Sequence, residues 1–423
     1  MRNSGIPWIG DIPKGWCVNL LSSLFDEHKQ KNKGLVETNL LSLSYGKIIR
    51  KDINTKEGLL PESFDGYNVI SSGDIVFRLT DLQNDKRSLR TGLCTENGII
   101  TSAYVTIRGR HSLNSAYYHY LFHSYDLCKV FYGMGEGVRQ GMNYGDLRKL
   151  LILLPSLSEQ QKIASFLDRK CSEIDEMIAL QEKIVEELKA YKQSVITEAV
   201  TKGLNPDVPM KDSGIEWIGE IPEHWEVGRM KNLCNQNPNS LSEKTDKDIE
   251  FDYVDIGSVS FEKGVFNTEH YKFSEAPSRA RRKANFGDFI MSTVRTYLRA
   301  IDVIDTQEKA NYIYSTGFAV LTPKAHISYK FLSYISKSQY FLEQVTTLSR
   351  GINYPSINST DLMTICVAHP SIEEQIQISD YLDKRCTEID NLISIKLSKI
   401  DSLKEYKKSI IYEYVTGKKE VKE

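Results

Sequence analysis

The stretch PSLSEQQKIASFLDRKCSEIDEMIALQEKIVEELKAYKQSVITEAVTKGL, residues 155–204, occurs a second time as PSIEEQIQISDYLDKRCTEIDNLISIKLSKIDSLKEYKKSIIYEYVTGKK from Pro370. The two copies align without a gap at an offset of 215 positions (370 − 155). Residues that match across the copies include Glu159, Leu167, Cys171, Asp175 and Tyr191 with Glu374, Leu382, Cys386, Asp390 and Tyr406. The chain therefore contains an internal repeat, and we expect its fold to be organised around the two copies.

Apolar residues in each copy recur at steps of three and four, which indicates one apolar stripe on a long helix. Neither copy has Pro or Gly between its opening proline and Thr201 or Thr416, so roughly 44 helical residues would span about 65 Å. A stripe of that length needs a partner of similar length, and the other copy predicts an antiparallel coiled coil within the chain. The predicted seam residues are Ile163, Leu167, Ile174, Ile178 and Leu188, then Ile378, Leu382, Ile389, Ile393 and Leu403.

A second motif precedes each long helix. Residues 4–16 read SGIPWIGDIPKGW and residues 213–225 read SGIEWIGEIPEHW, an offset of 209 positions. The whole chain is thus a tandem duplication of a globular segment plus a long helix. The predicted divisions are 1–155 for the first globular domain, 156–204 for the first helix, 205–212 for a linker, 213–370 for the second domain and 371–423 for the second helix.

The tryptophans of this motif are expected to be buried anchors, and stacking on nucleic-acid bases is the alternative. They are Trp8, Trp16, Trp217 and Trp225. The globular segments predict an α/β (α+β) fold, because short apolar runs between Gly and polar turns alternate with helical spacing. The predicted strand regions are Asn68–Leu79, Gly92–Thr95, Gly98–Arg108, Ala284–Thr293, Ala300–Ile304 and Ser315–Pro323, and the predicted helices are Ser115–Tyr132 and Tyr329–Leu348.

Composition excludes several classes of protein. Lys and Arg total 54 against 56 Asp and Glu, so the net charge of −2 gives no overall nucleic-acid signature, although a local basic face remains compatible with it. The 7 cysteines are scattered and odd in number, which argues against a disulfide framework and favours a reduced, cytoplasmic setting. No signal peptide and no run of 18 apolar residues is present, so no membrane span is expected.

Catalytic motifs are weak. The chain has no phosphate-binding loop of the type GxxxxGK[ST] and no zinc-spaced histidine pair. Asn353-Tyr-Pro-Ser has its proline and aromatic residue in the wrong places for an adenine methyltransferase motif, and Glu27-His-Lys29 with Asp11 is a chance-level nuclease pattern. We therefore expect no catalytic residue, no metal site and no cofactor on this chain.

The ordered set of motifs resembles the specificity (S) subunit of type I restriction–modification systems. The resemblance rests on the SGIxWIGxIPxxW opening of each half, on GDIVFRLTD, on GVRQGMNYGDLRKLLILLPSLSEQQKIASFLD, and on the duplicated helices. It implies two target-recognition domains held apart by two antiparallel helices. It also implies a non-catalytic subunit that recognises a bipartite double-stranded DNA target and docks two modification (methyltransferase) subunits, to which restriction subunits add. S-adenosylmethionine, ATP and Mg²⁺ would then bind the other subunits.

Two rigidly linked domains would also fix the separation of two half-sites, near one duplex turn of about 10 bp. Contacts to bases and phosphates require Arg, Lys, Asn and Gln on exposed loops, although each such residue can equally be an ordinary solvated charge. The candidates in the first domain are Arg78, Lys86, Arg87, Arg90, Arg139, Gln140, Asn143 and Tyr144. Those in the second are Arg279, Arg281, Arg282, Lys283, Arg295, Arg299, Arg350, Asn353 and Tyr354.

A different class of function is also open. A coiled-coil scaffold that joins protein partners without binding DNA would explain the helices equally well. It would leave the two loop-rich domains that carry arginines without a role. Steeply salt-dependent binding of the assembled complex to duplex DNA distinguishes the two hypotheses.

Overall fold

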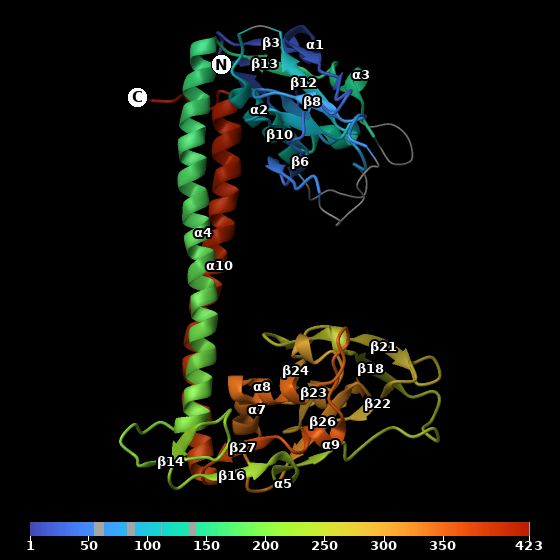
Figure 1. Cartoon of the computed structure of the whole chain (residues 1–423), viewed down its shortest axis with the longest axis vertical. Helices are drawn as coiled ribbons and strands as arrows, with labels where there is room; N and C mark the ends of the chain where they lie inside the picture. The colour runs from blue at the N-terminus through green and yellow to red at the C-terminus, as the bar shows by residue number, and fades with distance from the viewer. Residues whose placement is uncertain (55–62, 83–88, 111, 135–140, 423) are drawn as a thin grey trace. The chain divides into compact units, whose positions relative to one another are not determined.

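The computed structural model describes residues 1–54, 63–82, 89–110, 112–134 and 141–422. The chain divides into two compact units, Met1–Glu182 with Ser398–Glu423, and Lys183–Leu397. Each unit combines one α/β domain with segments of both long helices, α4 (Leu157–Lys202) and α10 (Ile372–Val415) (Figure 1). The fold class predicted from the repeat is therefore confirmed.

The two helices run antiparallel within the first unit. The rings of Phe166 and Tyr414 lie with centroids 4.4 Å apart, and the Lys407 ammonium lies 2.6 Å from the Asp175 carboxylate. From Phe166 to Asp175 the residue numbers rise along α4, while their partners on α10 fall from Tyr414 to Lys407. The two helices therefore run in opposite directions. The Arg169 guanidinium carbon also lies 5.8 Å from the Phe166 ring centroid.

The second unit repeats this arrangement. Lys192 on α4 lies 2.7 Å from Asp390 on α10, while Gly203, just after α4, lies beside Glu374 near the start of α10. At the repeat offset of 215, Asp390 corresponds to Asp175 and Lys192 corresponds to Lys407. The same ion pair therefore forms in both units with the roles of the two helices exchanged, as expected of a duplicated chain.

Burial of the predicted seam is uneven. Leu167 and Leu382 are fully buried, and Leu382 packs among Trp225 and Phe331 of the second domain. Its partners thus include the α/β domain as well as the other helix. Buried with them are Ile163, Ile174, Ile178, Ile378 and Ile389, whereas Leu188, Ile393 and Leu403 are half-buried.

Each α/β domain contains the same four-stranded antiparallel sheet. In the first unit its order is β10 (Thr91–Leu93), β9 (Ile75–Phe77), β12 (Val105–Gly109) and β4 (Phe25–Glu27). In the second unit the order is β24 (Ile301–Val303), β23 (Phe289–Ser292), β26 (Phe318–Pro323) and β17 (Cys234–Gln236). The central strands of both sheets are almost wholly buried. The duplication therefore extends to the core of the domains.

A second sheet differs between the units. It comprises β11 (Gly98–Ile100), β8 (Asn68–Ile70) and β5 (Gln30–Lys31) in the first unit. In the second it comprises β21 (Glu269–Lys272), β18 (Glu250–Val254), β25 (Ile313–Ser315) and β22 (Ala280–Lys283), in which β18 and β25 are parallel. Small pairs complete the units: β1 (Arg2–Asn3) with β2 (Asp11–Ile12), β6 (Leu41–Ser44) with β7 (Lys47–Arg50), β14 (Met210–Asp212) with β15 (Glu220–Pro222), and β19 (Val259–Ser260) with β20 (Gly264–Val265).

Helices cover these sheets near the positions that the sequence predicts. The first unit has α2 (Ser115–Leu127), followed by the 3₁₀ helix η1 (Val130–Gly133). In the second unit the predicted helix Tyr329–Leu348 is interrupted at Ser338, which separates α7 (Tyr329–Lys337) from α8 (Gln339–Leu348). The Ser338 hydroxyl donates to Ile335 O, and Gln339 N donates to the Thr197 hydroxyl on α4, so hydrogen bonds compensate the break.

Strand pairs join each domain to its helix. β3 (Cys17–Leu20) pairs with β13 (Leu151–Leu154) before α4, and β16 (Glu226–Arg229) pairs with β27 (Cys366–His369) before α10. Short helices α1 (Leu21–Leu24) and α5 (Met230–Leu233) follow β3 and β16. The final helix ends close to the predicted Thr416 end: Gly417 takes φ +69° and its N–H donates to Tyr414 O, so α10 ends at Val415, before the last residues of the predicted division 371–423.

The tryptophan motif is tied to the start of each long helix by a matching hydrogen bond. Trp16 Nε1 donates to Glu159 at 3.0 Å, and Trp225 Nε1 donates to Glu374 at 3.1 Å. Both indoles are buried, as expected of anchors. Trp217 differs from that expectation, because it is 40% exposed and only its neighbour Ile218 enters the core.

Replacing Glu159 by Gln is expected to lower the free energy of unfolding of the first unit by about 0.5–1 kcal/mol at pH 7, because solvent screens the bonds of this exposed carboxylate. The Glu159 carboxylate also accepts from Ser156 N and its hydroxyl. Burial disfavours the charged carboxylate and raises the pKa of Glu159. The hydrogen bonds from Ser156 and Trp16 have the larger, opposite effect, so the pKa of Glu159 is lowered. The stabilisation is therefore present above the unfolded pKa of about 4.3 and is lost as pH falls through the lower folded pKa.

Denaturant titrations of wild type and variant between pH 7 and pH 3 measure this effect. The difference in unfolding free energy should shrink on acidification. Glu176→Gln, an exposed change on the same helix, is the control and should alter stability by less than about 0.5 kcal/mol. A Glu159→Gln difference that stays constant with pH would contradict the assignment.

Candidate nucleic-acid interface

The second unit exposes two arginines in a strained backbone conformation. Arg295 and Arg299 flank the 3₁₀ helix η3 (Thr296–Leu298), with φ values of +51° and +49°. Residues other than glycine adopt this left-handed region only rarely, and such strain concentrates at functional sites. Between the arginines, Tyr297 and Leu298 are also exposed. Tertiary structure therefore holds a short segment RTYLR, residues 295–299, at the surface.

A neighbouring loop packs against this segment. It lies between α8 and α9 (Ser359–Leu362) and contains Arg350, Asn353 and Tyr354. The Arg295 guanidinium carbon lies 5.2 Å from the Tyr354 ring centroid, a cation–π arrangement, and Thr296 N donates to Pro355 O at 3.2 Å. Three of the predicted DNA-contacting residues, Arg295, Arg350 and Tyr354, thus come together on one surface.

Two phenylalanines extend this surface on the other side of η3. Phe261 lies near Arg299, whose guanidinium carbon is 5.9 Å from its ring centroid. Phe266 is 56% exposed and shares with Phe261, Leu298 and Arg299 the lining of a shallow hollow. Cations interleaved with aromatic rings suit the phosphates and bases of nucleic acid. We call residues 295–299, 350–354, Phe261 and Phe266 the RTYLR surface.

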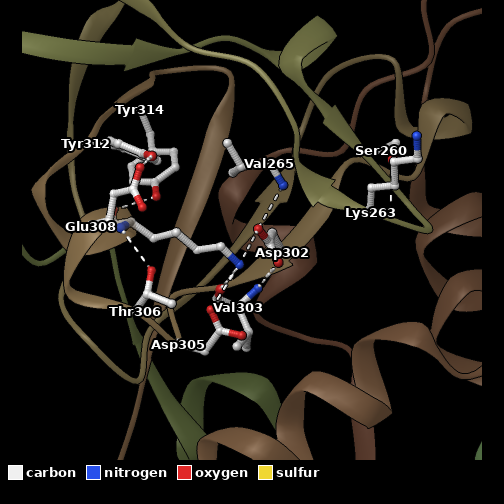
Figure 2. A network of polar contacts seen from close by, with 11 residues as sticks. Ser260, Lys263, Val265, Asp302, Val303, Asp305, Thr306, Glu308, Tyr312 and Tyr314 are labelled. Carbon is white, nitrogen blue, oxygen red and sulfur yellow. Dashed lines mark hydrogen bonds and ion pairs between the residues drawn. The ribbon is translucent and has the colours of Figure 1, made fainter. Parts of the chain in front are cut away.

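A buried polar network fixes the base of this surface (Figure 2). The Asp302 carboxylate, on β24 shortly after Arg299, accepts from Val265 N at 2.8 Å and pairs with the Lys309 ammonium at 3.0 Å. Lys309, in α6 (Gln307–Asn311), also pairs with Asp305 at 3.0 Å. Burial disfavours the ammonium, but these two carboxylates outweigh it and raise the pKa of Lys309.

Glycine is required within this network. Gly264 has φ +67, and a β-carbon there would collide with the Asp302 carboxylate. The network thus joins β20, β24 and α6, and it holds the chain on the C-terminal side of η3 in one position. Figure 2 shows Val265 and Asp302 directed toward each other from neighbouring strands.

The other predicted cations of the second domain lie along β22. Arg279 and Lys283 are exposed at its ends. Arg281 lies over the Phe273 ring at 4.8 Å, and Arg282 donates to the Ser240 hydroxyl at 3.3 Å. Burial lowers the pKa of Arg282. Arg281 and Arg282 are therefore held by the domain itself, whereas Arg279 and Lys283 present their charges to solvent.

The predicted residues of the first domain are less well assembled. Arg90 is fully buried, and its guanidinium donates to Thr80 O at 3.0 Å and to Asp81 O at 3.3 Å. It supports the loop instead of facing solvent, so we exclude it from the DNA-contacting set. Arg78, at the end of β9, is half-buried. Lys86, Arg87, Arg139 and Gln140 lie outside the described residues.

Asn143 and Tyr144, two predicted DNA-contacting residues of the first domain, also have structural roles. Asn143 caps α3 (Tyr144–Leu147) together with Asp146, and Tyr144 OH donates to Phe25 O at 2.8 Å. In the second domain Asn358 caps α9 together with Asp361. Asn143 and Asn358 are 215 positions apart, so the same helix cap forms in both units. In the second unit, Asn353 lies in the loop before this cap.

Sequence reasoning missed the apolar members of the RTYLR surface: Phe261, Phe266, Tyr297, Leu298 and Ile352. The arginines on both sides of Thr-Tyr-Leu were the only available signal for Tyr297 and Leu298. Within the described ranges, no group of three or more His, Cys, Asp or Glu side chains could hold a metal ion. No helix in that part of the chain is both long and apolar enough to cross a bilayer.

Comparison with known proteins matches this chain to one family. The family model described as "Type I restriction modification DNA specificity domain" matches residues 95–190 and 222–418. A specificity subunit of the type I restriction enzyme MjaVIII from Methanocaldococcus jannaschii is 27% identical over 77% of this chain and 76% of its own length. A putative MjaX specificity subunit from the same organism is 25% identical over 98% of this chain and 96% of its own.

Solved structures have the same fold. A chain from a structure of the type I restriction–modification system, studied for complex assembly and conformational transition, superposes with a TM-score of 0.70 at 18% identity. The superposition covers 96% of this chain and 99% of that one. The HsdS subunit from Thermoanaerobacter tengcongensis superposes with a TM-score of 0.54 at 16% identity, covering 99% of this chain and 100% of that one.

Proposed function

This chain belongs to the type I restriction–modification DNA specificity family, and we propose that its two α/β domains each recognise one half of a bipartite DNA target. DNA sequence recognition is the function of the family. The division into half-sites is supported by the duplication, since each unit carries the same four-stranded sheet on the same pair of helices. Two similar domains on one chain suit two separate short sequences better than one long sequence.

The RTYLR surface is the observation that carries the proposal for the second domain. Arg295, Arg299 and Arg350 are exposed, and the first two keep a left-handed backbone that the domain stabilises around them. Arginine pairs with guanine in the major groove and with phosphates, and the exposed aromatic rings add surface for bases or sugars. In the first domain the remaining candidates are Arg78, Asn143 and Tyr144, together with the four that lie outside the described residues.

We also propose that the chain is non-catalytic and acts with modification subunits, and through them with restriction subunits. The absence of catalytic sequence motifs and the family's role in type I systems support this assignment. The long helices are the proposed docking elements and the proposed determinant of the spacer between half-sites. Lengthening both by one turn should then change the spacer without altering either half-site.

Replacing both Arg295 and Arg299 by Ala is expected to weaken target binding at least tenfold, because one good arginine–guanine contact contributes about 1–3 kcal/mol. The measurement is fluorescence anisotropy of labelled duplex DNA with the assembled complex of this chain and its modification subunit, across a range of salt concentrations. If the arginines contact phosphates, the slope of log affinity against log salt should also shrink by about two.

Lys211→Ala is the matched control, since it removes one positive charge from exposed β14 outside the RTYLR surface. Its affinity and salt slope should equal those of the wild type. A double arginine variant that remains folded by circular dichroism and binds target with unchanged affinity would reject the RTYLR surface as the DNA-binding site.

A further inference from the structure

Ile352 is the most exposed large apolar side chain in the described part of the chain, with 99% of its surface accessible. Single apolar residues at a protein surface are common and need no explanation by themselves. Ile352 differs because of where it lies, in the loop that contributes Arg350 and Tyr354 to the RTYLR surface.

The loop that carries Ile352 is closed at its base. Arg350 N donates to Ser356 O at 2.8 Å, and Ser356 N donates to Arg350 O at 2.9 Å. The β-bridges Arg350 with Ser356 and Val294 with Ser356 connect this base to the chain just before η3. Residues between these bonds therefore form a short, anchored loop with Ile352 near its tip.

Glycine gives the loop its sharp turn. Gly351 has φ +108, and a β-carbon there would lie 3.2 Å from Tyr354 O, closer than most side chains tolerate. Ile352 itself is β-branched and stiff about χ1, so its methyl groups are presented with little freedom. The loop thus holds an apolar group outward in a defined place.

The surroundings indicate which partner this group meets. Arg350 is 83% exposed in its side chain, and Arg295 stacks over Tyr354 in the same loop. Asn353, next to Ile352, is exposed and can form two hydrogen bonds with an adenine edge. An apolar tip among cations does not suit an apolar protein surface. It suits a DNA groove, where the thymine C5-methyl is the distinctive apolar group.

We propose that Ile352 contacts the C5-methyl group of a thymine in the half-site recognised by the second unit, and so helps to determine specificity. This inference rests on the proposed function of the RTYLR surface. It also predicts one feature of the DNA target: that half-site contains a thymine whose methyl group faces the major groove beside the loop.

The test replaces each thymine of that half-site by deoxyuridine, one at a time on either strand, once methylation mapping has given the target. Deoxyuridine removes only the methyl group. With the wild-type complex, one replacement should weaken binding about fourfold, the effect of burying one methyl group. With an Ile352→Ala complex, the same replacement should have an effect below 1.5-fold, or about none, while other positions respond as in the wild type.

Two variants control for nonspecific effects. Ile352→Val keeps a branched side chain and should retain the deoxyuridine response. Ile249→Ala removes another exposed isoleucine of the same unit and should behave as wild type. Because Ile352 is solvent-exposed, none of these changes should alter folding, which circular dichroism verifies.

Failure of this inference is distinct from failure of the proposed function. If the wild-type complex does not prefer its target over scrambled duplex, the function itself is rejected. If it does, but no deoxyuridine replacement weakens it, or the response is the same in Ile352→Ala, the thymine contact is rejected. A rise in 2-aminopurine fluorescence at one base step that depends on Ile352 would mean insertion between bases, and would also overturn the methyl contact.

Discussion

Exchanging residues 213–369 for the matching segment of another specificity subunit is expected to change one half of the recognised DNA sequence completely and to leave the other half unchanged. The reason is that the sheet, the RTYLR surface and the supporting Asp302–Lys309 network all lie within this segment. The ion pair Asp175–Lys407 of the first unit lies outside it. The exchange therefore replaces one recognition surface and keeps the helices.

Methylation mapping of genomic DNA measures the outcome of this exchange. The reciprocal exchange of residues 4–154 is the matched control, and it should change only the other half of the target. The distance between the half-sites should stay the same in both chimaeras, since residues 156–204 and 371–423 are retained. A chimaera that changes both halves at once would contradict independent recognition by the two domains.

Replacing Leu382 by Asp is expected to destabilise the second unit by about 4 kcal/mol or more, most of the stability of a typical domain. Leu382 is fully buried on α10 and packs among Ile378, Trp225 and Phe331. The substitution removes apolar contacts and places a carboxylate where the surrounding core is apolar. It should therefore lower the unfolding temperature of the second unit and separate its transition from that of the first.

Leu392→Asp is the matched control for Leu382→Asp, because it makes the same chemical change on the same helix at a residue that is 47% exposed. Differential scanning calorimetry should show a large downward shift for Leu382→Asp and a small one for Leu392→Asp. Equal shifts for the two variants would show that the buried contacts of α10 have been misassigned.

The helices and the duplication could be predicted from sequence because both depend on regular spacing. Apolar steps of three and four residues define a helical face, and the 215-position offset pairs residues that play the same part in each unit. In the matching bonds Trp16–Glu159 and Trp225–Glu374, the glutamates follow this offset and the tryptophans follow the 209-position offset of their own motif. A long helix repeats its apolar pattern over many residues, so a single residue that departs from the pattern does not hide it.

The candidate site could be predicted only in part. Arg90 and Arg295 are alike in sequence, both close to turns in basic segments, yet one is fully buried among backbone carbonyls and the other is exposed over Tyr354. Which way a loop arginine turns depends on tertiary contacts that no local pattern encodes. The same holds for Trp217 and Ile352, whose apolar character predicts burial while the fold leaves them exposed.

The measurement that tests the central claim most directly is sequencing of adenine methylation in single molecules of genomic DNA. It compares cells that carry this chain and a matching modification subunit with cells that carry the modification subunit alone. We predict a methylated bipartite motif with a fixed gap that depends on this chain. No new motif, with the modification subunit present and bound to this chain, would contradict sequence recognition and favour a scaffold that does not bind DNA.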